Sequence, residues 1–321
     1  MNGIRDRRYQ INDRTRSNFA TSLTLHSRFL EFSMNKLQRL WLLTPILVAG
    51  CKGSETGFTE PNIGPIAYVR YVHAMPDTGL VVVRWVDRVE NWVGTPTSGT
   101  TLGVPYGTVT PFQGVAAGSR TFKVWPATTD INLTQDEIAT GTVTLTADTY
   151  YTVLHTGYAR CQGAAPAQSI VLIQETPPTP AAGQFSLRTI VAAPGFATAQ
   201  DAYVTDAAGD PLPAAPQWNA LTYSQDAAAL AAIPWVGVDT GTAVVRLYND
   251  GTTATATLSS SVPTGARATV SSTNDLPGSR ISGSGLTAFV FPQAQTGAAC
   301  ATSGSIRAIY GIDRRPTVPT N

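Results

Sequence analysis

The stretch AYVRYVHAMPDTGLVVVRWVD (Ala67–Asp87) decides the fold that we expect for this chain. Its first part alternates polar and apolar side chains, its last part is rich in valine, and Met-Pro-Asp-Thr-Gly separates the two parts. β-Branched and aromatic residues favour strands, whereas Pro, Asp and Gly favour turns. The stretch therefore predicts two consecutive strands joined by a turn.

Further segments of the same kind follow. They are short, rich in β-branched or aromatic residues, and bounded by turn-forming residues: SRTFKVWP (119–126), GTVTLTA (141–147), TYYTVLHTG (149–157) and SIVLIQE (169–175). One segment, SQDAAALAAIP (224–234), has the composition of a short helix. Short strands at this spacing are typical of β-sandwiches. We expect an all-β protein with two tandem immunoglobulin-like sandwich domains.

The two domains are inferred from an internal repeat. A proline-rich break, ETPPTPAAG (175–183), divides the body of the chain, and three pairs of segments match across it in the same order: 68–89 with 185–207, 114–125 with 237–248, and 169–180 with 305–316. The first alignment starts Tyr68 opposite Phe185 and allows an indel. A period of about 120 residues predicts tandem copies. We expect a domain at 66–175, a linker at 176–183, a degenerate second domain at 184–316 and a tail at 317–321.

Composition and charge favour an extracytoplasmic protein. The 321 residues are 43% hydrophobic and only 13% charged. Residues 1–50 carry eight Lys and Arg against three acids, whereas the chain from Cys51 onward carries 14 against 18. The body is mildly acidic, which gives no reason to expect nucleic acid as a partner.

A secretory signal is predicted at 34–50. The cationic segment MNKLQR (34–39) precedes the apolar run Leu40–Val48. This run is too short to span a bilayer, which takes about twenty residues, but it has the length of a signal-peptide core. We infer that translation starts at Met34 and that residues 1–33 are an upstream or unstructured extension.

The signal ends in Val48-Ala49-Gly50-Cys51, which resembles the lipobox of bacterial lipoproteins. Small residues before the cysteine let the peptidase seat the bond, and the thiol accepts the lipid. The alternative is a plain signal peptide with an unrelated cysteine. Because Lys52 rather than aspartate follows, analogy with enteric lipoproteins predicts attachment to the outer membrane, on its periplasmic or surface face. Residues 51–65 are expected to form a flexible tether.

Two cysteines remain if Cys51 carries lipid. Cys161 and Cys300 can then pair in one way only, in an oxidising compartment. The alternative is two separate thiols, since sequence does not give the geometry of the pair.

The first domain resembles the bacterial family known as domain of unknown function 4397 (DUF4397). The resemblance rests on the His73–Asp77 motif HAMPD, on Tyr106-Gly107, on a strand from Gly118 to Val124 and on a late strand from Leu145 to Val153. The second domain has Ala-Ala-Pro-Gly at 192–195 in place of the motif, without its His and Asp. The resemblance implies a secreted or surface-anchored β-sandwich, often in tandem, with no established chemistry.

The motif residues are expected to be structural. His73 with Asp77 has the chemistry of a metal site or a base, but the sequence lacks the histidine spacing of known metal motifs. Pro76-Asp77 suits a turn, which the histidine ring would fix by hydrogen bonding. Asp-Thr-Gly occurs at 77–79 and 239–241, yet Asp239 aligns with Ala116, so these are not an aspartic-protease pair. We predict no catalytic residues, no metal and no cofactor.

These features predict a lipid-anchored cell-envelope protein with a non-enzymatic adhesion, scaffolding or assembly role. Its expected partners are the membrane and an envelope protein or glycan. The alternative is a carbohydrate- or ligand-binding surface module, in which tryptophans stack on sugars if they share one exposed face. An extracytoplasmic hydrolase is disfavoured, because no nucleophile, base and acid occur together.

Overall fold

The computed structural model describes residues 64–87, 103–127, 137–161, 166–192, 194, 198–266, 276–292 and 305–316. All of them belong to one unit of the chain, Asn62–Asn321. Cys51, the predicted signal and tether, and Cys300 lie outside the described residues. The described chain consists of strands and one five-residue helix, α2 (Ala227–Ala231). The all-β sandwich prediction is therefore confirmed.

The first half of the described chain forms two sheets. The inner sheet has the order β3-β1-β6-β7 and the outer sheet the order β2-β4-β5. Their bounds are β1 (Ile66–Ala74), β2 (Val81–Trp85), β3 (Gln113–Ala116), β4 (Gly118–Pro126), β5 (Ala139–Leu145), β6 (Tyr150–Thr156) and β7 (Ser169–Glu175). Alternate residues of β1, such as Val69 and Tyr71, pack against Phe122 and Val124 of β4 to form the core of this sandwich.

The second half also forms two sheets. The inner sheet has the order β11-β8-β14-β15 and the outer sheet the order β10-β9-β12-β13. Their bounds are β8 (Gln184–Val191), β9 (Gln200–Thr205), β10 (Trp218–Leu221), β11 (Val236–Asp239), β12 (Val244–Asn249), β13 (Leu258–Ser261), β14 (Gly285–Pro292) and β15 (Ile306–Arg314). The helix α2 lies where the sequence predicts it, and its N-cap Asp226 accepts a hydrogen bond from the amide of Ala228 at 2.8 Å.

The two inner sheets have corresponding strand orders. In each, the first strand pairs in parallel with a later strand, β1 with β6 and β8 with β14, and that strand pairs antiparallel with the next, β7 or β15. Arg70 lies opposite Thr152, and Arg188 lies opposite Thr287. Arg70 and Arg188 therefore occupy equivalent positions. The sequence alignment of 68–89 with 185–207 allows one indel, and it agrees with this register when the indel falls before Arg70.

The hydrophobic pattern does not fix the place of the indel, because the central strands are buried on both faces. β8 and β14 show almost unbroken burial, as does β1 from Val69 onward. Alternation of apolar and polar residues sets the register of a strand only where one face is exposed. Without that signal, the sequence pattern fits the correct register and a register shifted by one residue almost equally well.

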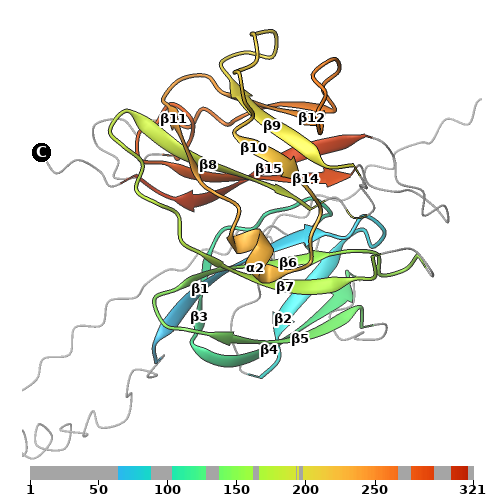
Figure 1. The fold of residues 1–321 in the computed structure, drawn as a ribbon. Helices are drawn as coiled ribbons and strands as arrows, with labels where there is room; N and C mark the ends of the chain where they lie inside the picture. The colour runs from blue at the N-terminus through green and yellow to red at the C-terminus, as the bar shows by residue number, and fades with distance from the viewer. Residues whose placement is uncertain are drawn as a thin grey trace, which may run out of the picture. The chain divides into compact units, whose positions relative to one another are not determined.

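Burial on both faces arises because the inner sheets pack against each other. Figure 1 shows four layers, with β9, β10 and β12 at the top, then β8, β14 and β15, then β1, β6 and β7, and β2, β4 and β5 at the bottom. A separate apolar cluster fills the space between the inner layers, with Val72 and Leu154 from the first sandwich and Ile190, Phe289 and Phe291 from the second. The described residues contain no helix of the length and apolarity needed to cross a membrane.

Candidate functional site

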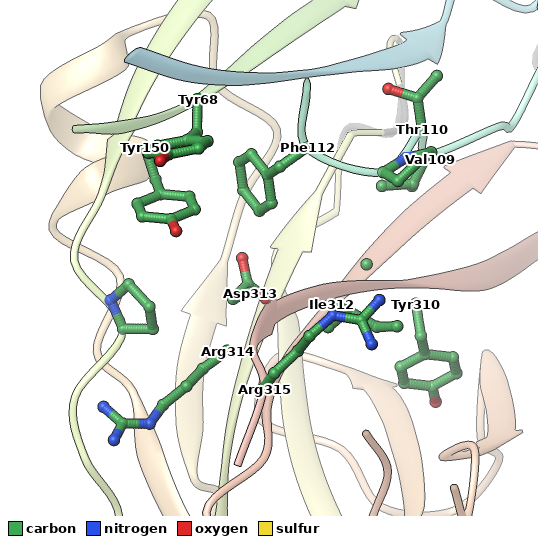
Figure 2. Close-up of a pocket in the computed structure, with 13 residues that line it drawn as sticks. Tyr68, Val109, Thr110, Phe112, Tyr150, Tyr310, Ile312, Asp313, Arg314 and Arg315 are labelled. Atoms are coloured by element: carbon green, nitrogen blue, oxygen red, sulfur yellow. The ribbon is translucent and has the colours of Figure 1, made fainter. Parts of the chain in front are cut away.

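A pocket of about 760 Å³ opens where the two sandwiches meet. Its walls come from β1, from the segment before β3, from the start of β6 and from β15. Figure 2 shows Tyr68, Tyr150 and Phe112 on one side of it and Arg314 and Arg315 on the other. Small-molecule pockets in proteins have volumes of roughly 300–1,000 Å³, so the space suits a ligand of modest size.

The aromatic wall is built by strand pairing. Tyr68 and Tyr150 are opposite each other in the parallel register of β1 and β6. Their rings stack with centroids 4.6 Å apart and planes 15° apart. Phe112 meets Tyr150 edge to face at 5.1 Å. Tyr150 remains 39% exposed, which leaves part of its surface open to the solvent. The wall thus offers aromatic surface that the core does not use.

The opposite wall is cationic. Arg314 ends β15 and donates from Nη1 to the hydroxyl of Thr179 at 2.6 Å. Arg315 follows directly and is exposed. The Nε atom of Arg314 is buried and lacks a hydrogen-bond acceptor among the described residues. Neither arginine forms an ion pair with a described carboxylate. Within the part of the chain that the structure describes, no carboxylate therefore neutralises either charge at the pocket.

Behind the pocket lies a buried cluster of ion pairs that links the sandwiches. Arg70 donates from Nη2 to Glu175 at 3.2 Å and to Asp313 at 2.6 Å. Arg188, the equivalent of Arg70, donates to the other oxygen of Glu175. Thr152 accepts from Arg70 Nε at 2.8 Å and donates to Glu175. One carboxylate of the first sandwich thus binds an arginine from each sandwich.

All members of this cluster are nearly or fully buried. Burial raises the pKa of Asp313 to about 6, and Arg70 opposes that shift. Arg70 also packs between two aromatic rings, with its guanidinium 4.7 Å from the centroid of Phe112 and 5.2 Å from that of Phe289. Because Phe112 belongs to the aromatic wall, the cluster supports the pocket from behind.

His73, a predicted structural residue, is fully buried in the first sandwich. Its Nδ1 lies 3.1 Å from the carbonyl oxygen of Val104, to which it donates, and its Nε2 lies 2.8 Å from the hydroxyl of Thr78. Burial lowers the pKa of His73 to about 4, so the ring is neutral at neutral pH. The ring ties the end of β1 to the turn that follows it.

His155 is the neighbour of His73 across the parallel register. Its Nδ1 accepts from the hydroxyl of Tyr71 at 2.8 Å, and its Nε2 faces the side-chain oxygen of Gln168 at 3.3 Å. Burial, with a smaller contribution from His73, lowers the pKa of His155 to about 3. A second hollow of about 540 Å³ includes His155 and Glu137 in its lining. His155 is nevertheless 0% exposed, and Glu137 pairs with Lys123 at 2.7 Å.

Asp77 receives three backbone hydrogen bonds from the loop after β6. Its carboxylate accepts from the amides of Ala159, Arg160 and Cys161 at 3.2, 2.6 and 2.9 Å. Pro76 is buried beside it. Asp77 therefore joins the turn after β1 to a loop about 80 residues later in the chain. Asp239, from the other Asp-Thr-Gly, ends β11 in the second sandwich and accepts from Gln184 at 3.0 Å.

Two other predicted residues have simpler environments. Gly118 begins β4 with φ of +103°, a conformation that L-residues with side chains rarely adopt. Cys161 belongs to the loop that Asp77 binds and donates its backbone amide to the Asp77 carboxylate at 2.9 Å. Because Cys300 lies outside the described residues, the Cys161–Cys300 pair stays a prediction.

The aromatic residues of the pocket differ from those that the sequence suggested for sugar binding. Trp85, Trp125 and Trp218 are buried, and Trp92 lies outside the described residues. Trp235 is half-buried beneath the guanidinium of Arg188, 4.5 Å from its ring centroid. The accessible aromatic surface is provided by Tyr68, Phe112 and Tyr150 instead. Sequence reasoning missed them because strand pairing and the packing of the sandwiches bring them to the arginines of β15.

By its fold, the described chain is an all-β protein of two sandwiches, and it has a pocket where the sandwiches meet. Residues 67–200 match the family model described as "Domain of unknown function (DUF4397)". The match runs from β1 through β8 to the first residue of β9, so the similarity covers the first sandwich and the entry into the second.

Among solved structures, the chain is similar to a "Putative cell adhesion protein" from Parabacteroides distasonis. The identity is 11% and the TM-score 0.17, over 77% of this chain and 98% of that one. A likeness at this level carries no argument about function. No curated protein matches the chain in sequence.

Proposed function

We propose that this chain is a lipid-anchored cell-envelope protein with a non-enzymatic role in adhesion, scaffolding or assembly. The non-enzymatic part of this proposal rests on one observation. The histidines and carboxylates named below are already hydrogen-bonded or ion-paired inside the protein. Both described histidines are buried with both ring nitrogens hydrogen-bonded inside the protein. Asp77 binds backbone amides, and Glu175 and Asp313 bind arginines. Groups held in this way stabilise the fold and are not free to move protons for a substrate.

The proposed anchor is a lipid on Cys51, after cleavage of the signal at 34–50, with attachment to the outer membrane. It rests on the order of charged, apolar and small residues before the cysteine. Several acyl chains on one cysteine give stable attachment, whereas a single chain does not. The proposed Cys161–Cys300 disulfide and the reading of the second sandwich as a degenerate copy of the first belong to the same proposal.

The anchor is tested by comparing the full chain with the Cys51→Ser variant in cells fed labelled palmitate. We expect the label and the membrane-pellet fraction to be lost together in Cys51→Ser and kept in Ser54→Ala, a neighbouring control. Retention of Cys51→Ser in the pellet without label would show that the cysteine is not the anchor.

The role is tested by pull-down of envelope proteins and glycans with the full chain. A reproducible partner supports adhesion or assembly. Turnover of a glycan or peptide by the purified chain, abolished by His155→Gln, would contradict the non-enzymatic role.

A carbohydrate- or ligand-binding module is a second candidate, and a specific observation favours it. The pocket joins partly exposed aromatic rings to two arginines that form no ion pair with a described carboxylate. Flat, amphipathic rings such as Tyr150 supply contact area for ligands at low entropy cost. Adhesion and ligand binding are compatible, because an anchored protein can attach to a surface by binding its glycans.

A further inference from the structure

We propose that the pocket between the sandwiches binds an acidic saccharide, whose ring packs on the wall formed by Tyr150 and Phe112 and whose carboxylate pairs with Arg315. This inference rests on the second candidate function above and names its site and ligand class.

The aromatic wall has an exposed surface that a ligand can contact. Tyr150 begins β6 and is one of few large apolar side chains that are exposed in the described chain. Its position is fixed by stacking on Tyr68 from one side and by the edge of Phe112 from another. A rigid aromatic surface of this kind suits the flat apolar face of a sugar ring.

The accessible charge of the pocket is positive. Three charged residues line it, Asp313, Arg314 and Arg315. Asp313 is buried and bound to Arg70 at 2.6 Å, so its negative charge is compensated on the inner side. Arg315 is exposed and Arg314 half-buried, and neither has a described carboxylate as partner. The guanidinium fork binds carboxylates through two parallel hydrogen bonds, which makes an anion the complementary ligand.

The two walls come from different sandwiches but are held together before any ligand arrives. Phe112 packs on Arg70, and Arg70 binds Asp313, the residue that precedes Arg314. The aromatic and cationic walls are therefore coupled through one buried ion pair. A pocket that is already in its binding geometry loses little entropy when the ligand is bound.

Aromatic rings opposite arginines favour a ligand that combines a flat ring with an acid, as a uronic acid does. A flexible acidic peptide would satisfy the arginines but leave the aromatic wall without a matching flat face. A neutral sugar would stack on the wall but leave the arginines unpaired. The two halves of the pocket together select a ring that carries a carboxylate.

The test is isothermal titration of the full chain in detergent micelles with three probes: a trigalacturonate, a neutral galactose trisaccharide and a triglutamate peptide. We expect binding of the trigalacturonate, at least tenfold weaker binding of the other two, and weakening as salt is raised. The variants Tyr150→Leu and Arg315→Ala should each weaken binding about tenfold. Arg280→Ala, which removes an exposed arginine elsewhere in the second sandwich, should leave binding unchanged.

Three outcomes would overturn the inference. Equal binding of the neutral trisaccharide would remove the role of the arginines, and equal binding of triglutamate would make the site a peptide site. Absence of binding by all three probes would reject the pocket as a binding site for acidic saccharides. None of these outcomes alters the palmitate and fractionation results with Cys51→Ser, so failure here is distinct from failure of the anchored envelope role. Circular dichroism of each variant shows whether the fold is kept.

Discussion

Arg70 donates to Asp313 at 2.6 Å across 243 residues of sequence, and both side chains are fully buried. The contact joins the first strand of the first sandwich to the last strand of the second. Buried charges are costly to remove from water, and only a close partner offsets that cost. The pair therefore specifies which faces of the two sandwiches meet, in addition to the apolar cluster between them.

Replacing Arg70 with Met should destabilise the protein strongly. Glu175 keeps Arg188, but Asp313 loses its ion-pair partner while buried. Loss of one member of a buried ion pair typically costs about 3–5 kcal/mol of the free energy of unfolding. Urea denaturation followed by tryptophan fluorescence measures the change. The matched variant Arg280→Met, at an exposed position, should change stability by no more than about 0.5 kcal/mol.

A double replacement separates the cost of an orphaned charge from the value of the ion pair. In Arg70→Met with Asp313→Leu, no unpaired aspartate remains, so part of the lost stability should return. If the double variant is as unstable as the sum of the two single variants, the coupling between Arg70 and Asp313 is negligible and the interpretation of the pair is wrong.

The histidines predict a loss of stability in mild acid. The pKa of His155 is about 3 in the folded protein against an ordinary 6.5, so the unfolded chain binds a proton that the folded chain does not. The stability that this contributes is present above pH 6.5 and is lost as the pH falls from there towards the folded pKa. His73, with a folded pKa of about 4, acts in the same direction.

Measurement of unfolding free energies at pH 6.5 and 4.5 tests this for His155→Gln, which keeps an amide in the ring's place. The parent should lose about 2–3 kcal/mol more than the variant over this interval. Asp313, with a pKa raised from 3.8 to about 6, has the opposite slope, since its contribution is lost as the pH rises. It is present in both proteins and cancels in the comparison. Parallel pH profiles for the two proteins would rule out a neutral, buried His155.

The carboxylate of Asp77 should hold the loop at 159–161. In Asp77→Asn, one acceptor oxygen becomes an amide that faces backbone N–H groups, which should cost about 1–3 kcal/mol. Hydrogen exchange should accelerate at the amides of Ala159, Arg160 and Cys161. Asp210→Asn is the control, because Asp210 accepts one amide bond in an exposed turn. Unchanged exchange at all three amides would contradict the assignment.

The disulfide between Cys161 and Cys300 is tested by alkylation of the unfolded Cys51→Ser chain. We expect no reactive thiol before reduction and two after it. Closing a loop of this length stabilises a folded chain by about 5 kcal/mol in the chain-entropy model, so reduction should lower the melting temperature. Cys300→Ser should expose one thiol without reductant. Two reactive thiols in the unreduced chain would refute the pair.

Local features of the fold are predictable from the sequence. SIVLIQE has the bounds of β7, because turn-forming residues bound the segment. SQDAAALAAIP contains α2, because an aspartate caps the start of the helix. The sequence alignment did not decide whether Leu187 or Arg188 is the equivalent of Arg70, since strands buried on both faces give little alternation to set the register. The pocket was missed because Tyr150 and Arg315 are joined only by sheet pairing and by the packing of the inner sheets.

The Arg70–Asp313 link also bears on how the molecule would carry mechanical load. If Cys51 carries the proposed lipid, a pull from the membrane would enter the described chain at β1, its first strand. β1 lies between β3 and β6 in its sheet, so a pull along its axis shears two rows of hydrogen bonds at once. Through Arg70 the same force reaches β15, at the far end of the folded chain. Under the proposed anchor, the strand that receives the load is thus held on both edges by β3 and β6 and tied through Arg70 to the last described strand.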